Sequence, residues 1–153
     1  NVPSDELSGG MKRKVFVAMA LASGAETVFL DEPTTGLDPL SRVEVWSAIK
    51  ELPSEIIITT HYMEEAQTLS DEIVFIEGGR ILKQGTPEEV LSEFKGKVRV
   101  ESKKPVNGWK KVGNVYISYV SVEEAKRYVE MGYDVKQISL EDLFFYYGVE
   151  VEP

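Results

Sequence analysis

The sequence of 153 residues has no cysteine, which excludes disulfide bonds, thiolate metal ligands and cysteine nucleophiles. It also has no apolar run near the roughly 20 residues needed to cross a bilayer. The longest such run extends from Val15 to Ala22. The N-terminus lacks the charged start and apolar block of a signal peptide. Because the chain begins at Asn1 rather than Met, we expect a processed chain or a fragment of a longer protein.

Positive charge and histidine are also scarce. The chain has 17 Lys and Arg residues against 26 Asp and Glu residues, a formal net charge of −9. This balance argues against nucleic acid as a partner. An apolar content of 42% and a charged content of 28% are typical of a globular protein. The one histidine, His61, would by itself most often be structural, so its position in the fold decides how it is interpreted.

A serine and two glycines stand directly before a helical run at residues 11–21. Ser8 is a natural N-cap, and Gly9 and Gly10 allow another molecule to approach the backbone closely. Helix N-termini present free N–H groups and partial positive charge, so the pattern indicates an anion site, most plausibly for a phosphate. The alternative is an ordinary Gly-Gly turn before a buried helix.

Apolar strands alternate with helices up to residue 85, which predicts an α/β fold with a mostly parallel sheet and flanking helices. The near-continuous apolar run at residues 27–30 predicts a strand buried on both faces. Asp38 and Pro39 predict the start of a helix that ends before Pro53. Its expected buried face consists of Leu40, Val43, Trp46 and Ile49. Further strands are expected at 56–59 and 73–76, a helix at 63–69, and a hairpin through Gly78-Gly79 into 80–82.

Three chemically capable side chains follow two of these strands. Asp31 and Glu32 follow one strand, and His61 follows another. Parallel strands end at the same edge of a sheet, so we expect the three to lie together. Asp31 could hold Mg²⁺, Glu32 could orient and deprotonate a water, and His61 could bind a terminal phosphate. Alternatively, the two acids only cap the loop into Pro33.

The sequence changes character after Gly85, and we predict two domains, at residues 1–92 and 93–153. Residues 86–89 form a capping box with proline that opens a helix to about residue 94. A small α+β unit follows, with strands at 97–101, 115–120 and 135–138 and helices capped by Ser121 and Ser139. The aromatic residues at 144–147 are too clustered for one helix face, so core packing plus an interface is expected. This part carries no recognisable chemistry.

Together these motifs resemble those of ABC-type ATPases. LSGGM at residues 7–11 resembles the signature motif, and VFLDEPT at 28–34 resembles the Walker B strand with its catalytic glutamate. GLD at 36–38 is similar to the D-loop, and Thr60-His61 to the switch histidine. The segments 11–14, 61–66 and 139–144 resemble the branch that drives drug, antibiotic or polysaccharide exporters.

The chain contains no G-x-x-x-x-G-K-[ST] loop, which supplies the lysine and backbone cradle for phosphates. The adenine-stacking aromatic residue and the glutamine loop of the family are also missing. The resemblance therefore implies the C-terminal part of a nucleotide-binding domain, inactive by itself. In the family, two domains meet head to tail around ATP. The resemblance implies that Ser8, Gly9 and Gly10 bind the γ-phosphate of the partner's ATP and that Asp31 holds Mg²⁺ through water. It further implies that Glu32 polarises the attacking water, His61 contacts the γ-phosphate and Asp38 communicates across the dimer.

The resemblance also implies partners and a location. These are a second nucleotide-binding domain, most simply in a homodimer, and a transmembrane permease subunit at the cytoplasmic face of the membrane, with Mg²⁺ and ATP bound. In the family, the strand that bears the missing loop lies between the strand ending at Thr59 and the strand at 73–76. We therefore expect a gap or exposed strand edge there, and an oligomeric, swapped or rearranged chain. The alternatives are a soluble ABC-type ATPase in DNA repair or translation, and a non-catalytic interaction module that retains the motifs.

Overall fold

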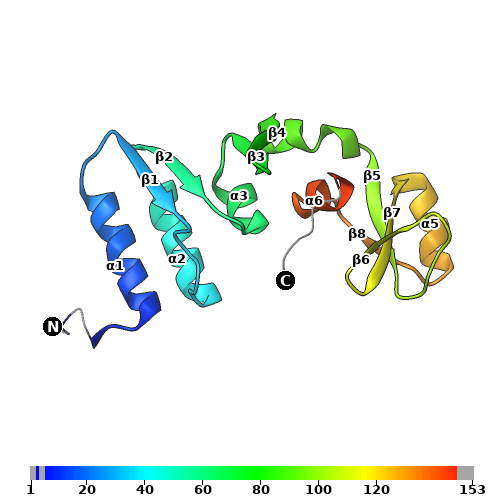
Figure 1. The fold of residues 1–153 in the computed structure, drawn as a ribbon, viewed down its shortest axis with the longest axis horizontal. Coiled ribbons are helices and arrows are strands. Elements are labelled where there is room, and N and C mark those ends of the chain that lie inside the picture. Colours follow the sequence, from blue (N-terminus) through cyan, green and yellow to red (C-terminus); the bar gives the residue numbers. More distant parts are fainter. Residues whose placement is uncertain (1–2, 4–5, 148–153) are drawn as a thin grey trace. The chain divides into compact units, whose positions relative to one another are not determined.

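The computed structural model describes residue 3 and residues 6–147. Its contacts divide the chain into two compact units, residues 1–69 and 70–153, which are described separately (Figure 1). The division differs from the expected domain boundary after residue 92, because the hairpin that follows residue 70 packs with the C-terminal unit. The boundary at residue 92 stays a prediction about the domains of the protein.

The first unit contains one parallel strand pair and three helices. Strands β1 (Thr27–Asp31) and β2 (Glu55–Thr59) pair in parallel, with Thr27 opposite Glu55 and Asp31 opposite Thr59. Within the described residues no third strand joins this pair. The helices are α1 (Gly9–Ala22), α2 (Pro39–Lys50) and α3 (Met63–Leu69). The order is the predicted alternation of strands and helices.

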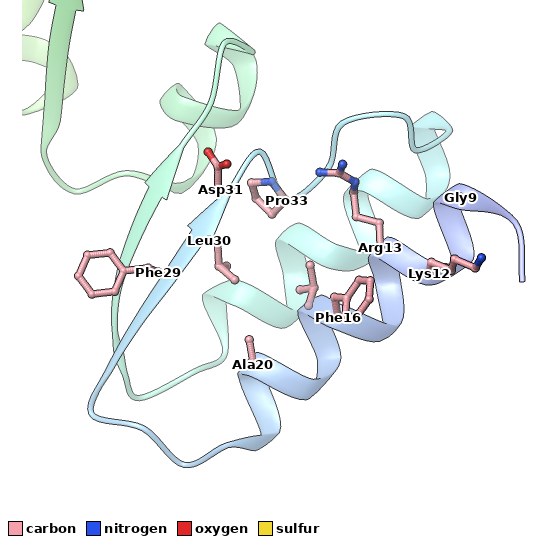
Figure 2. Close-up of a pocket in the computed structure, with 10 residues that line it drawn as sticks. Gly9, Lys12, Arg13, Phe16, Ala20, Phe29, Leu30, Asp31 and Pro33 are labelled. Carbon is pink, nitrogen blue, oxygen red and sulfur yellow. The ribbon is translucent and has the colours of Figure 1, made fainter. Parts of the chain in front are cut away.

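In the described part of the chain, only one face of the β1–β2 pair is covered. Val28 and Leu30 of β1 are buried in the core, with Ile56 and Ile58 of β2 packed beside them. Phe29 points to the other face and is 73% exposed, and Figure 2 shows it directed away from α1. The expectation of a strand buried on both faces is therefore wrong for this chain. The apolar run predicted the strand correctly, but no part of the described chain covers its second face.

Helix α2 differs from the prediction in its buried face. Trp46 and Ile49 are buried as expected, but Leu40 is 70% exposed and Val43 is 54% exposed. Val45 is buried in their place. The prediction followed every third residue from Leu40 to Ile49 and so left out Val45.

The second unit begins with a hairpin. Strands β3 (Ile73–Glu77) and β4 (Arg80–Gly85) are antiparallel, joined by Gly78 and Gly79 with positive φ values of 54° and 74°. Positive φ at both central residues is what a tight hairpin turn requires, so glycine fits both positions. Because this hairpin is antiparallel, the parallel part of the chain is limited to β1 and β2. Within the described residues β2 has one edge without a strand partner, which agrees with the expected exposed strand edge.

A four-stranded antiparallel sheet forms the rest of the second unit. Its order is β6-β7-β5-β8, and β6 was not predicted. Helix α5 packs on the sheet around Val100, Val120 and Ala125. The predicted capping boxes are present at Thr86–Glu89 and Ser121–Glu124. The remaining elements are α4 (Pro87–Val90), η2 (Ser92–Phe94), β5 (Lys97–Ser102), β6 (Lys110–Val112), β7 (Val115–Ser121), α5 (Val122–Glu130), β8 (Asp134–Lys136) and α6 (Glu141–Tyr147).

A buried ionic network fixes α6 in the second unit. The carboxylate of Asp142, which is fully buried, accepts hydrogen bonds from Arg99 Nη1 at 2.7 Å and from the Tyr119 hydroxyl at 2.9 Å. Its second oxygen accepts from the backbone N–H of Ser139 at 2.8 Å. Phe144 packs on Phe75, with ring centroids 4.3 Å apart. Three donors around one buried carboxylate make this network a structural anchor of the unit.

Candidate functional site: the carboxyl edge of the parallel strands

The site is built where β1 and β2 end. The parallel register places Asp31 opposite Thr59, and the Thr59 hydroxyl donates a hydrogen bond to the Asp31 carboxylate. The backbone N–H of Glu32 donates to the carbonyl of Thr59 at 2.9 Å, which extends the pairing by one residue. The segments that follow β1 and β2 therefore leave the sheet at the same edge, as the parallel topology predicted.

Glu32 and His61 are in direct contact at this edge. His61 Nδ1 lies 2.9 Å from Glu32 Oε2, with 64% of the histidine side chain and 32% of the glutamate side chain exposed. The hydroxyl of Thr35 donates to the same carboxylate oxygen at 3.0 Å. Arg13 of α1 donates to the backbone carbonyl of Glu32. The expected juxtaposition of Glu32 and His61 is thus present, and the pair is open to a ligand.

The backbone of Glu32 adopts a rare conformation. Its φ of 48° lies in the left-handed region, and Glu32 is the one residue other than glycine with positive φ among those described. For an L-residue such a conformation costs on the order of 1–3 kcal/mol and is retained only where the surroundings impose it. The bonds from Arg13 and to Thr59 hold this backbone on both sides. The strain turns the Glu32 side chain out of the strand and toward His61.

The serine and glycines lie at the start of α1 as predicted. The hydroxyl of Ser8 accepts a hydrogen bond from the backbone N–H of Met11 at 3.2 Å, so Ser8 is the N-cap. A Cβ atom on Gly9 would meet nothing within 4 Å. One on Gly10 would lie 3.4 Å from Leu37 Cδ2, which is at the edge of ordinary contact. Neither glycine is therefore demanded by the packing of this chain.

Asp38 caps the second helix. Its carboxylate accepts hydrogen bonds from the hydroxyl of Ser41 at 2.6 Å and from the backbone N–H of Ser41 at 3.0 Å. These bonds, with the hydroxyl contribution the larger, lower the pKa of the Asp38 carboxyl below its ordinary value. Gly36, two residues earlier, has a φ of 78°, so the turn before the cap needs its conformational freedom.

A cavity of about 420 Å³ lies between α1 and the end of β1 (Figure 2). Its inner wall is apolar, with Phe16 and Ala20 of α1 and Leu30 of β1. Its rim is charged, with Lys12 and Arg13 on one side and Asp31 on the other. The contact of Arg13 with Glu32 was not predicted from the sequence, although the basic residues that begin at Lys12 were the signal for it.

Glu65 forms a second group of contacts at this edge, and the sequence did not predict them. The carboxylate of Glu65 on α3 accepts hydrogen bonds from the Thr34 hydroxyl at 2.5 Å and from Trp46 Nε1 at 2.9 Å. Glu65 and Thr34 are both fully buried. The sequence offers no sign of this burial, because Glu64 and Glu65 are adjacent acids of the same type.

Comparisons with known proteins identify relatives of this chain. A family model described as "AAA domain, putative AbiEii toxin, Type IV TA system" matches residues 1–65. The chain is 43% identical over 99 residues to the Nod factor export ATP-binding protein I of Rhizobium etli, covering 63% of this chain and 31% of that protein. It is 43% identical over 94 residues to a daunorubicin resistance ATP-binding protein of Streptomyces coeruleorubidus, covering 60% of this chain and 30% of that protein.

Solved structures give the same result. A structure of the ATP-binding subunit of an ABC transporter is 28% identical, with a TM-score of 0.55, over 60% of this chain and 40% of that chain. A dimeric ATP-binding cassette bound to ADP and phosphate is 24% identical, with a TM-score of 0.50, over 54% of this chain and 37% of that one, and it shows likeness of fold alone. The homologues of this chain are thus ATP-binding proteins of ABC transporters, and its α/β fold is that of ABC ATPase domains. The chain spans less than a third of the length of the curated relatives named here.

Proposed function

We propose that this chain supplies the signature, Walker B, D-loop and switch-histidine parts of an ATP-hydrolysing subunit of an ABC exporter. The observation that carries the proposal is the 2.9 Å contact between Glu32 and His61 at the carboxyl edge of two parallel strands. A carboxylate held by a histidine, beside a second carboxylate on Asp31, suits hydrolysis of a phosphate anhydride by an activated water. Relatives that are ATP-binding proteins of exporters support the same assignment.

Each residue has a distinct role in this proposal. Glu32 orients and deprotonates the attacking water, and the strained backbone fixes the direction of its side chain. With His61 Nδ1 directed at Glu32, Nε2 is the ring nitrogen left to face the terminal phosphate. Ser8, Gly9 and Gly10 bind the phosphate held by a second nucleotide-binding domain, because Gly9 leaves its helix end open to an incoming molecule. Asp38 acts across the dimer.

The residues fit Mg²⁺ bound in the manner of nucleotide enzymes. No group of three or more acidic or histidine side chains suited to a metal occurs in the described part of the chain. Mg²⁺ commonly keeps several waters and uses one or two carboxylates together with substrate phosphates, so a single exposed carboxylate suffices. One oxygen of Asp31 accepts from Thr59, which orients the carboxylate and leaves its other oxygen for a metal-bound water. The ion would supply neutralisation of phosphate charge.

Assembly completes the proposed site. The phosphate-binding lysine loop is not present in these 153 residues, so we expect this chain alone to be inactive. Among the described residues, no helix has the length and apolar character to span a bilayer. Its likeness to ATP-binding proteins of exporters supports a further proposal, that the protein works at the inner face of the membrane with a permease subunit and a second nucleotide-binding domain.

The experiment is ATP hydrolysis by the protein at its full natural length. Glu32→Gln keeps the shape and one acceptor but removes the base, so we expect hydrolysis to fall by about 10²–10⁴-fold while ATP still binds. Glu64→Gln, at an exposed position on α3, is the matched control and should retain activity. Hydrolysis by Glu32→Gln at the unchanged rate would refute the proposal. Co-purification with membrane subunits would separate a transporter subunit from a soluble ATPase.

A further inference from the structure

Among the described residues of the first unit, Glu65 is the most deeply buried acid, and it has no role in the reaction proposed above. Its exposed fraction is 0%, whereas the neighbouring Glu64 is exposed. One carboxylate oxygen accepts from the Thr34 hydroxyl and from Trp46 Nε1, and the other has no hydrogen-bond partner. Burying a carboxylate is costly unless its hydrogen bonds compensate, so the contact with two donors matters to the fold around it.

Glu65 and its donor Thr34 belong to the two segments that carry the site. Thr34 lies two residues after Glu32, in the turn that follows β1. Glu65 lies on α3, which begins two residues after His61. Its bond to Thr34 therefore ties the segment after β1 to the segment after β2. The bond from Trp46 fastens the same carboxylate to α2.

The contact between Glu32 and His61 needs support from neighbouring segments. The backbone of Glu32 is held in the left-handed region, and such strain persists only where neighbouring contacts impose it. His61 is mostly exposed, so little packing of its own side chain fixes it. The 2.9 Å contact between Glu32 and His61 must then be set by the segments that carry them.

We propose that Glu65 is a positioning residue, which holds Glu32 and His61 in contact by anchoring Thr34 and α3 to one another. Glu65 itself touches neither residue's reacting atoms in this arrangement. The geometric claim stands independently of ATP hydrolysis, and only its catalytic consequence rests on the proposed function.

Two substitutions separate hydrogen bonding from packing. Glu65→Gln keeps a carbonyl oxygen for both donors and places its amide nitrogen where the unpartnered oxygen stood. Glu65→Leu fills a similar volume but accepts no hydrogen bond. Thr34→Val removes the donor hydroxyl from the other side of the bond while keeping the shape of the side chain. Glu64→Leu is the matched control on the exposed position of α3.

The measurement is nuclear magnetic resonance of the protein at its full natural length, labelled with ¹⁵N in histidine and tryptophan. His61→Gln and Trp46→Phe assign the two signals. The Trp46 indole signal reports whether its bond to Glu65 is intact. The His61 ring nitrogen signals depend on the surroundings of each nitrogen, so they report a change in the contact between Nδ1 and Glu32. Glu32→Ala supplies the spectrum of His61 without its partner.

We expect Glu65→Leu and Thr34→Val to move the His61 spectrum toward that of Glu32→Ala, and Glu65→Gln and Glu64→Leu to leave it unchanged. In ATP hydrolysis, kcat should fall by about 10- to 100-fold in Glu65→Leu with KM little changed, and Glu65→Gln should restore it. An unchanged His61 spectrum in a folded Glu65→Leu or Thr34→Val protein would overturn the proposal, as would an equal change in Glu65→Gln. Failure of the wild type to hydrolyse ATP would refute the proposed function and leave the spectral comparison to decide the role of Glu65.

Discussion

His61 Nδ1 lies 2.9 Å from Oε2 of Glu32, although the two residues belong to segments separated by a helix and a strand. The parallel pairing of β1 and β2 brings them together, since Asp31 and Thr59 are register partners and each is followed within two residues by one member of the pair. The contact thus follows from strand topology together with the strained turn at Glu32. Variants at this edge and in each of the two units test how the molecule is held together.

The open N-terminus of α1 predicts that a substitution at Gly9 lowers activity without lowering stability. In Gly9→Ala the added Cβ atom has no other atom within 4 Å. Alanine also has a higher helix propensity than glycine, so the free energy of unfolding should stay the same or rise slightly. ATP hydrolysis by the protein at its full natural length should fall strongly, because the added methyl group meets the incoming nucleotide. Chemical denaturation and hydrolysis rates provide the check. Full activity in Gly9→Ala would contradict the proposed role of the glycine.

The one-sided burial of β1 predicts opposite outcomes for two neighbouring residues. Leu30→Ala removes a core side chain and should lower the free energy of unfolding of this chain by about 2–5 kcal/mol. Phe29→Thr changes an exposed side chain and should alter it by no more than about 0.5 kcal/mol. Urea denaturation of both variants measures the difference. A large loss from Phe29→Thr would show that the exposed face is covered by other polypeptide.

The Asp142 network predicts a strong effect on the stability of the second unit. Asp142→Ala leaves the guanidinium of Arg99 without its fully buried partner, and breaking such a pair costs about 3–5 kcal/mol. Arg99 retains its contact with Glu101, which is partly exposed, so Glu101→Ala should cost less. Thermal and chemical unfolding of the C-terminal unit give the comparison. Equal losses from the two substitutions would refute the special role of Asp142.

The buried hydroxyl of Tyr119 should make the stability of the folded protein fall at alkaline pH. Burial, and then the negative charge of Asp142, raise the pKa of the Tyr119 hydroxyl well above its ordinary value of about 10. Above pH 10 the unfolded chain therefore loses this proton while the folded chain keeps it, so stability falls as pH rises. The slope contributed by one proton is at most about 1.4 kcal/mol per pH unit.

Tyr119→Phe isolates this contribution from the other titrating groups. The variant should be less stable than the wild type at neutral pH, because Asp142 loses a donor. Its stability should fall less steeply above pH 10. Denaturation midpoints between pH 8 and 11 measure both slopes, and parallel curves would count against the buried hydroxyl.

Local signals in the sequence were sufficient for much of the fold. Ser8 and Asp38 cap the helices for which they were predicted, and Gly78-Gly79 forms the expected turn. Such features depend on a few neighbouring residues, and so their physics is contained in a short stretch of sequence. The meeting of Glu32 and His61 followed from one further rule, the common edge of parallel strands.

The remaining features depend on contacts between distant residues. Phe29 and Leu40 are exposed because nothing in the described chain covers them, and an apolar pattern cannot show what covers a face. Glu64 and Glu65 are the same residue type in adjacent positions, yet only Glu65 faces the donors from Thr34 and Trp46. The roles of the site residues stay predictions until the variants are measured.

The pair of strands β1 and β2 has a practical consequence for handling the chain. Both of its outer edges lack a strand partner within the described residues, and a sheet of two short strands gains little stability by itself. Two molecules that meet along these edges can satisfy the same backbone groups. Recovery of native protein from denaturant should therefore decline as concentration increases, and dilute samples should give the highest yield.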